Sequence, residues 1–176
     1  MRPLRAFLCF CVPAVLLSAP ASSAELEKNV KAAYLYKFLS YVEWPATEPA
    51  VGSPLVIGVL NADDVYASLL PIVQGRQAQG HPVQVRTIKA GEAISGVHLL
   101  FVGRAASSEL TRLAGQPGVL IVSEIEGGLE QGAMINLLRV GDRVRFEVAP
   151  GIAERGGLRI SSRMLTVALR VKGERP

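Results

Sequence analysis

Cysteine, histidine and tryptophan are all scarce in this chain. Its 176 residues include two cysteines, two histidines and one tryptophan, and both cysteines, Cys9 and Cys11, lie near the N-terminus. Beyond Cys11 the chain has no thiol, which excludes disulfides, cysteine-based metal sites and redox sensing by residues of that part. We interpret His81 as a solvated turn residue, because Pro82 follows it, and His98 as a satisfied core residue at the start of an apolar strand.

Catalytic and nucleotide-binding motifs are also missing. The sequence contains no Gly-x-Ser-x-Gly elbow, no His-Glu-x-x-His and no Walker pattern. The turn after the apolar run 55–60 has none of the glycines that let a backbone approach phosphate. Asp63 and Asp64 follow that run, and we interpret them as helix-start carboxylates and not as a metal site. We therefore predict no enzymatic activity, no cofactor and no metal.

Hydrophobic runs long enough to span a bilayer, roughly 20 residues, are absent as well. The N-terminus instead has a basic start, an apolar run over residues 6–17 and small residues up to Ala24. This pattern predicts a signal peptide of residues 1–24, cleaved after Ala24 or alternatively after Ala21. We expect the mature protein, residues 25–176, to be a single domain in the periplasm, with Glu25 or Ser22 at its N-terminus.

A large excess of charge of either sign is lacking too. Arg2 and Arg5 belong to the predicted signal peptide, so 17 of the 19 basic residues remain against 15 acidic residues, a formal charge of +2. A charge of this size, without a basic run, argues against nucleic acid and against a polybasic membrane contact.

Apolar residues at helical spacing predict a first helix over residues 25–43 that is ended by Pro45. Further along, apolar runs of strand length alternate with helical patterns, which is typical of parallel strands joined by right-handed crossovers. The predicted strands are residues 55–60, 83–88, 98–102 and 119–123, and the predicted helices between them cover residues 61–73 and 105–113.

The last third of the chain follows another pattern. Residues 133–138 and 144–148 flank Gly141-Asp142, which predicts an antiparallel hairpin. Helical signals return from Pro150, break at Gly156-Gly157, and predict a C-terminal helix over residues 158–171. Its predicted inner face carries Ile160, Met164, Val167, Ala168 and Val171. The expected fold class is α/β, a single domain with a mixed sheet of parallel strands flanked by helices plus the C-terminal antiparallel hairpin.

Aromatic residues concentrate on the first predicted helix, at Tyr34, Tyr36, Phe38, Tyr41 and Trp44. Core packing accounts for most of them. Tyr36 differs, because helical geometry places it roughly 160–200° from Tyr34 and Phe38, so it should face outward or toward a partner.

Charged residues surround the hairpin and the predicted last helix. Solvated charge is the default interpretation for them, although Arg155, Arg159 and Arg163 recur every four residues. With Phe146 and Ile160 beside them, they would form an apolar patch with a charged rim, which is the anatomy of a protein contact.

Several segments together resemble the YfiR family of small exported bacterial proteins. They are Lys31-Ala-Ala-Tyr-Leu-Tyr-Lys-Phe38, Tyr41-Val-Glu-Trp-Pro45, Gly132-Ala-Met-Ile-Asn136, Arg143-Val-Arg-Phe-Glu147 and Ala153-Glu-Arg-Gly-Gly-Leu-Arg-Ile-Ser-Ser-Arg-Met-Leu165. The resemblance implies a periplasmic α/β protein that restrains an inner-membrane diguanylate cyclase by binding its periplasmic sensor domain, thereby lowering cyclic di-GMP and biofilm formation. The chain departs from the family in lacking cysteine in its mature part, and in having Ala149-Pro150 where asparagine is common.

The first hypothesis is therefore a periplasmic regulator that binds and represses the sensor domain of an inner-membrane signalling protein, foremost a diguanylate cyclase. Its predicted contact residues are Phe146, Glu147, Glu154, Leu158, Ile160, Ser161 and Tyr36. The alternative is a periplasmic small-molecule binding module that serves another membrane sensor or transporter, with a groove near Asn61, Gly103 and Ser123 at the carboxyl ends of the parallel strands. The sequence leaves open the identity of the partner and whether the chain forms a homodimer.

Overall fold

The computed structural model describes residues 23–45, 49–50 and 52–173. Its elements are, in chain order, α1 (Ser23–Phe38), β1 (Val42–Glu43), β2 (Leu55–Leu60), α2 (Asp63–Val73), β3 (Gln77–Ala78), β4 (His81–Ile88), β5 (Leu99–Val102), the 3₁₀ helix η1 (Arg104–Ala106), α3 (Ser107–Leu113), β6 (Leu120–Ser123), β7 (Ile135–Val140), β8 (Arg143–Val148), α4 (Pro150–Arg155), β9 (Arg159–Ile160), α5 (Ser162–Val167) and β10 (Arg170–Val171).

The predicted signal peptide lies outside the described residues, apart from Ser23 and Ala24, which begin α1. Every helix in the described part of the chain is too short or too polar to cross a membrane.

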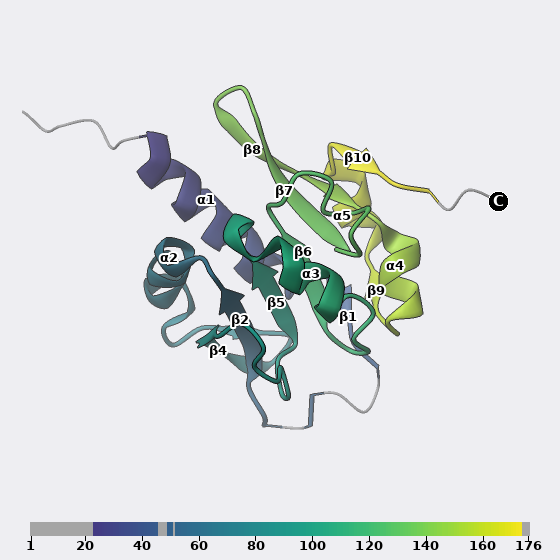
Figure 1. Cartoon of the computed structure of the whole chain (residues 1–176). Coiled ribbons are helices and arrows are strands. Elements are labelled where there is room, and N and C mark those ends of the chain that lie inside the picture. The colour runs from purple at the N-terminus through teal and green to yellow at the C-terminus, as the bar shows by residue number, and fades with distance from the viewer. Residues whose placement is uncertain (1–22, 46–48, 51, 174–176) are drawn as a thin grey trace, which may run out of the picture.

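One mixed sheet organises the molecule, with the strand order β10-β8-β7-β6-β5-β2-β4-β3 (Figure 1). From β4 to β7 neighbouring strands run parallel, whereas β8 returns antiparallel to β7 through the turn at Gly141-Asp142. The short strand β10 lies parallel to β8 at one edge, and β3 pairs antiparallel with the start of β4 at the other. The sequence predictions of a mixed α/β fold and of the C-terminal hairpin are therefore confirmed.

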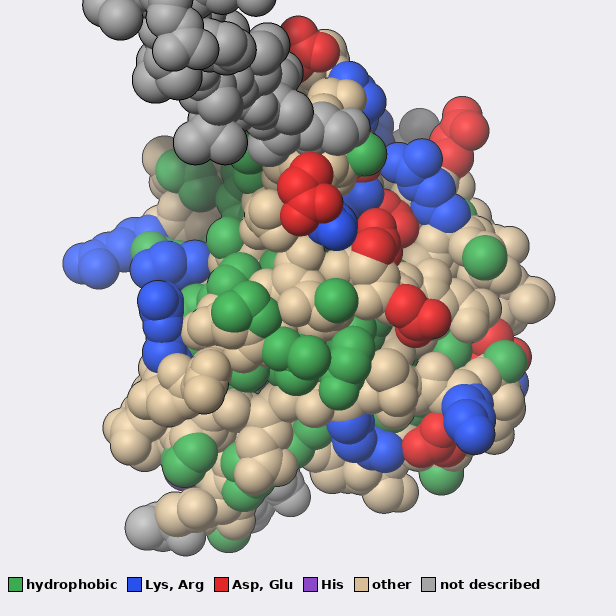
Figure 2. Space-filling model, turned by 90° about the vertical axis from the view of Figure 1, so that its left-hand side faces the viewer, with side chains coloured by type: hydrophobic (Ala, Val, Ile, Leu, Met, Phe, Trp, Pro, Cys, Tyr) green, Lys and Arg blue, Asp and Glu red, His purple; other side chains and the backbone are tan. Residues whose placement is uncertain are grey.

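Helices cover both faces of this sheet. Leu35 and Phe38 of α1, with Leu69 of α2, are buried against one face, and Leu110 and Leu113 of α3 are buried against the other. Each buried large apolar side chain contributes about 1.5–3 kcal/mol. Seen from the side of α1 and α2, hydrophobic side chains gather in the middle of the surface (Figure 2). Basic side chains cluster at the left edge of this view and mix with acidic ones elsewhere.

The first helix is shorter than predicted. α1 ends at Phe38, where turn bonds from the Ser40 and Tyr41 amides to the Lys37 and Phe38 carbonyls close its last turn. Val42 is 1% exposed, in agreement with the apolar pattern, but it is buried as part of a strand. The apolar spacing correctly predicted that Val42 is buried but wrongly predicted that it lies in a helix. A side chain can be buried equally well from a strand or from a helix.

The predicted C-terminal helix over residues 158–171 is wrong. The chain there forms β9, α5 and β10. Ile160 and Met164 are buried as expected, at 7% and 2% exposure, whereas Val167 and Val171 are 62% and 42% exposed. Gly157 has a φ of +79°, which favours glycine and turns the chain, and the two short strands then find partners that are distant in sequence.

The helix predicted over residues 61–73 forms as α2 and runs through Pro71. Its N-cap is Ala62, which makes no side-chain capping bond. Asp64 lies in the first turn, where its Oδ1 accepts a hydrogen bond from the Val65 amide at 2.8 Å. The predicted 105–113 helix corresponds to η1 and α3, and β3 is a strand that the sequence pattern did not reveal.

Candidate functional site

Two of the segments that carry the resemblance meet in space at a short antiparallel ladder. Val42 of β1 pairs with Ile160 of β9, and Glu43 pairs with Arg159. The side chains of Val42 and Ile160 are buried in the core, whereas Glu43 and Arg159 are exposed. The ladder therefore has an apolar inner side that fixes its position and a charged outer side that is available for contact.

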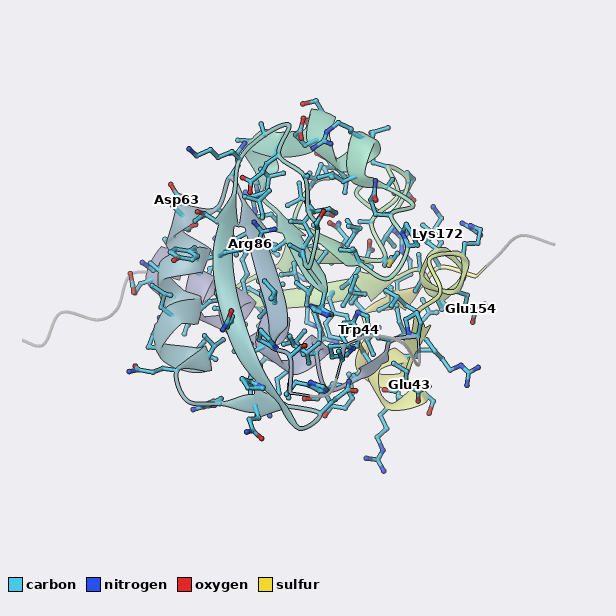
Figure 3. The ribbon with its side chains drawn as sticks, turned by 90° about the horizontal axis from the view of Figure 1, so that it is seen from below. Glu43, Trp44, Asp63, Arg86, Glu154 and Lys172 are labelled. Carbon is cyan, nitrogen blue, oxygen red and sulfur yellow. The ribbon has the colours of Figure 1, made fainter. Side chains whose placement is uncertain are left out.

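A pocket of about 470 Å³ lies beside this ladder, and we call it the Trp44 pocket. It is lined by Glu43, Trp44, Pro45, Glu154, Gly157, Leu158 and Arg159. Figure 3 shows Glu43, Trp44 and Glu154 on the same side of the molecule. A side chain at Gly157 would stand 3.6 Å from the Pro45 ring, in addition to straining the backbone there. Glycine thus shapes one wall of the pocket.

The indole of Trp44 has an unusual hydrogen-bonding state. Its Nε1 is buried and has no hydrogen-bond partner among the described residues. No other buried side-chain nitrogen or oxygen of these residues lacks one. The ring packs edge-on against His98, with the ring centroids 6.4 Å apart. A buried N–H without an acceptor costs about 1–3 kcal/mol. Because this nitrogen is buried, a group outside the protein does not reach it in this conformation.

The charges at the rim of the Trp44 pocket are only loosely engaged. Glu43 and Arg159 are 3.9 Å apart, and their side chains are 69% and 80% exposed. An ion pair of this kind contributes at most about 1 kcal/mol. Glu154 is exposed and makes no ion pair among the described residues. The rim can therefore change partners at small cost.

Three predicted contact residues lie beneath the surface. Phe146, Leu158 and Ile160 are 4%, 1% and 7% exposed. The Phe146 ring packs edge-on against Tyr34 and Phe38, with centroids 5.4 Å and 5.2 Å away. In this conformation these side chains support the surface from within. An Ile160→Asp substitution would therefore place a charge in the core and destabilise the fold, so it is not a clean test of a surface contact.

Glu147 and Ser161 are half-buried and engaged within the chain. An oxygen of the Glu147 carboxylate lies 3.0 Å from Arg170 Nε, an ion pair that joins β8 to β10. The Ser161 hydroxyl accepts a hydrogen bond from the Met164 amide and so caps α5. Both residues hold the C-terminal segment in place, and of the predicted set Glu154 is the one that is fully on the surface.

Tyr36 is half-buried, and its contacts come from the same chain. Its hydroxyl donates to the carbonyl oxygen of Gln77 at 2.9 Å, and the Arg76 guanidinium lies 5.7 Å from the ring centroid. Helical geometry correctly separated Tyr36 from Tyr34 and Phe38. It could not predict that Tyr36 contacts Arg76 and Gln77, because β3 is only two residues long and leaves no pattern in the sequence.

The three arginines predicted at helical spacing do not form one stripe. Arg155 ends α4, Arg159 belongs to β9 and Arg163 lies in α5. The break at Gly156-Gly157 separates them, so their four-residue spacing has no structural meaning.

The predicted small-molecule groove is closed at its centre. A side chain at Gly103 would meet the carbonyl oxygen of Asn61 at 2.1 Å, so the backbones already touch. Ser123 is fully buried, and its hydroxyl donates to Asn136 Oδ1 at 2.6 Å. Gly128 packs directly on this pair, because a Cβ there would lie 2.2 Å from Ser123 Oγ and 2.6 Å from Asn136 Oδ1.

Ion pairs fill the remaining space at the carboxyl ends of the strands. Lys31 of α1 is 8% exposed, and its Nζ lies 2.5 Å from carboxylate oxygens of both Glu27 and Glu124. Arg104 approaches the same glutamates at 3.8 Å and 3.7 Å. The pocket that remains measures about 230 Å³, below the roughly 300–1,000 Å³ of ordinary ligand sites. This cluster joins α1 to the sheet.

The pKa values of this cluster follow from its contacts. Burial of Lys31 acts to lower its pKa, but hydrogen bonds to Glu124 and Glu27 outweigh burial and raise the pKa above its usual value. The hydrogen bond from Lys31 lowers the pKa of Glu27 against the opposing effect of burial. Both groups are therefore charged at neutral pH and hold each other in place.

The histidines belong to the framework. His98 is buried, and its Nδ1 accepts a hydrogen bond from the Val56 amide at 3.1 Å, as expected for a satisfied core residue. His81 is half-buried at the start of β4, with Nδ1 2.8 Å from the Ser53 carbonyl oxygen, and is not a solvated turn residue. The described residues contain no cluster of three or more histidine, cysteine, aspartate or glutamate side chains that could hold a metal ion.

Comparison of the sequence with known protein families identifies the family of this chain. No curated protein matches the chain in a sequence search. A family model described as YfiR/HmsC-like matches residues 28–169, a range that contains α1 after its first turn, the β1–β9 ladder and the β7–β8 hairpin. Because the match extends over most of the chain, the protein belongs to the YfiR/HmsC-like family.

Proposed function

We propose that the protein is a periplasmic regulator that binds the periplasmic domain of an inner-membrane diguanylate cyclase and holds the cyclase inactive. Membership of the YfiR/HmsC-like family supports a role in this signalling system. The observation that carries a contact role for this chain is the Trp44 pocket, because exposed and weakly paired charges form its rim and two of the segments that carry the family resemblance build it.

The chemistry of the Trp44 pocket suits a protein partner. An apolar side chain of the partner would pack on the rings of Trp44 and Pro45, and a basic side chain would pair with Glu154 at the rim. Leu158 and Ile160 contribute by holding the rim on a rigid base. Glu43 and Arg159 are exposed enough to exchange their weak ion pair for contacts across the interface.

Substitutions on the rim test this proposal without disturbing the core. Deleting the gene should raise cellular cyclic di-GMP, and Glu154→Arg should imitate the deletion because it places a repulsive charge in the contact. Glu126→Arg makes the same change at an exposed glutamate in the loop after β6 and should leave cyclic di-GMP unchanged. Trp44→Phe, which removes one ring from the pocket lining, should weaken repression to an intermediate level.

Three outcomes would contradict the proposal at different points. Unchanged cyclic di-GMP in the deletion strain would exclude a diguanylate cyclase as the partner. A folded Glu154→Arg protein that still represses the cyclase would show that the Trp44 pocket is not the contact surface. Mass spectrometry of the periplasmic fraction should find an N-terminus at Glu25 or Ser22, and an intact Met1 form in the cytoplasm would remove the periplasmic location.

A further inference from the structure

The edge of β8 near the hairpin turn is open. β8 pairs with β7 along its whole length, from Arg143 to Val148, but with β10 only at Glu147 and Val148. On the side away from β7, residues 143–145 therefore have no neighbouring strand in the part of the chain that is described. Figure 1 shows this end of the hairpin projecting beyond β10.

The backbone groups of Val144 point to this open side. The Phe146 carbonyl accepts a bond from the Leu169 amide at 2.8 Å, so the backbone of Phe146 faces away from β7. In an antiparallel ladder this orientation repeats every second residue, which gives Val144 the same direction. Its carbonyl accepts only a long hydrogen bond from the Tyr34 hydroxyl, at 3.4 Å, and its N–H has no acceptor among the described residues.

A groove runs between this edge and α1. It has a volume of about 470 Å³, and one of its lining residues, Ser23, belongs to the predicted signal peptide. In the predicted mature chain its walls are Leu26, Glu27, Val30 and Tyr34 of α1 and, on the hairpin, Arg139, Asp142 and residues 143–145. Leu26 is 59% exposed and adds apolar surface to this groove. The groove thus offers apolar surface alongside unpaired backbone groups.

Two arginines of this edge lack carboxylate partners. Arg143 and Arg145 make no ion pair or side-chain hydrogen bond within the described residues. Arg86 of β4, near the other edge of the sheet, is instead paired with Glu92 at 3.1 Å and also donates to the Ser95 carbonyl. The chain thus supplies a counter-charge for Arg86 at the β4 edge, whereas its described residues supply no ion-pair partner for Arg143 and Arg145 at the β8 edge.

We propose that the β8 edge binds an extended segment of a partner protein in which acidic and apolar residues alternate. The segment would add a strand by bonding to the Val144 backbone. Side chains directly across a ladder share one face of the sheet, so acidic residues would lie opposite Arg143 and Arg145, and an apolar residue would lie opposite Val144 and enter the groove. This site is separate from the Trp44 pocket and does not depend on the identity of the membrane partner.

The surface suits a peptide better than a membrane. The groove is concave, whereas a bilayer is flat, and Glu25, Glu27 and Asp142 offset the arginines over a wider area. A polybasic membrane site gathers several unopposed basic residues. Two arginines two positions apart on one strand instead match two carboxylates at the same spacing.

A blocked nine-residue peptide of alternating glutamate and valine is the probe for this site. Titrated into the isotope-labelled exported protein, it should shift the Val144 amide resonance and slow its hydrogen exchange. The Arg143→Gln/Arg145→Gln double variant should bind at least about tenfold more weakly. Arg86→Gln, the matched control at the other edge, should bind as the unmodified protein does. A peptide with lysine in place of glutamate should not bind.

Each other result would overturn the inference. Absence of binding at about 1 mM peptide would do so, as would equal affinity of the double variant or shifts confined to another surface. Binding to vesicles containing phosphatidylglycerol, lost in the double variant while the peptide fails to bind, would assign the edge to the membrane. A dimer in sedimentation experiments that the double variant abolishes would assign it to a second copy of the chain.

Discussion

The two halves of the β7–β8 hairpin share one sequence pattern and have different surroundings. Near its base, Ile135, Leu137, Phe146 and Val148 are all at most 4% exposed. Near its turn, Val140 is 47% exposed and the neighbouring arginines reach solvent. The base packs against the Tyr34 and Phe38 rings of α1, while the turn end borders the groove that runs along the earlier part of that helix up to Tyr34.

This contrast shows that alternation specifies a strand but not what covers it. Residue for residue, β8 alternates polar and apolar from Arg143 to Val148. Where α1 packs on the strand, the apolar positions form the core. Val144, near the turn, is still 8% exposed, but there α1 leaves a groove beside the strand, and the arginines on either side of Val144 border an open edge. Core-building and recognition can therefore be assigned to two halves of a single hairpin and tested separately.

The largest expected effect comes from emptying the base of the hairpin. Phe146→Ala removes a ring that contacts Tyr34 and Phe38, and should lower the free energy of unfolding by about 3–5 kcal/mol. Urea unfolding followed by circular dichroism measures this change. Val140→Ala, at the exposed end of the same hairpin, is the control and should change stability by less than about 0.5 kcal/mol. Equal losses of stability from the two substitutions would show that the base and the turn end of the hairpin contribute alike to the core.

A smaller loss is expected from crowding the polar pair beside the base. Gly128→Ala would push a methyl group into Ser123 Oγ and Asn136 Oδ1, and should lower the free energy of unfolding by about 1–3 kcal/mol. Gly173→Ala introduces the same methyl group where nothing lies within 4 Å and should be neutral. A Gly128→Ala protein with an unchanged thermal midpoint would show that the Ser123–Asn136 pair is not tightly held.

Acid should weaken the link between α1 and the turn end. Glu27 lies 3.7 Å from Arg139, and its pKa is lowered chiefly by the hydrogen bond from Lys31. A lowered pKa in the folded state stabilises the protein above the ordinary value of 4.5, and this contribution disappears as the pH falls through the folded-state pKa. Between pH 7 and pH 3, Glu27→Gln should lose about 1 kcal/mol less stability than the unmodified protein.

Glu25 provides the control for this pH experiment, since its side chain is 50% exposed on the same helix. Glu25→Gln should follow the pH profile of the unmodified protein. Lys31 does not confuse the result, because its raised pKa stabilises the protein below the ordinary value of 10.5 and loses that contribution only in more alkaline solution. Parallel acid profiles for Glu27→Gln and the unmodified protein would contradict the assignment.

The smallest effect on stability is expected at the turn end itself. The Arg143→Gln/Arg145→Gln double variant should unfold within about 0.5 kcal/mol of the unmodified protein, because neither side chain makes an ion pair among the described residues. Calorimetry at neutral pH checks this. A loss of more than about 1 kcal/mol would mean that the turn end belongs to the structural core after all.

The sequence by itself determined the elements whose signal is local. Continuous apolar runs predicted the buried strands, and Gly141-Asp142 predicted the hairpin turn, because a strand covered on both faces and a tight turn both impose residue types on short segments. The resemblance carried by the first helix and the C-terminal segment correctly predicted the family.

Tertiary structure decided which residues meet. Short strands such as β1, β9 and β10 exist only because a distant partner supplies their hydrogen bonds, so a local pattern assigned those residues to helices. Contacts between distant parts of the chain buried Phe146 and Ile160, left Val167 exposed, and brought Trp44 and Glu154 into one pocket. A side chain's type restricts its environment, but its neighbours depend on contacts across the chain, and these neighbours create the Trp44 pocket and the open edge of β8.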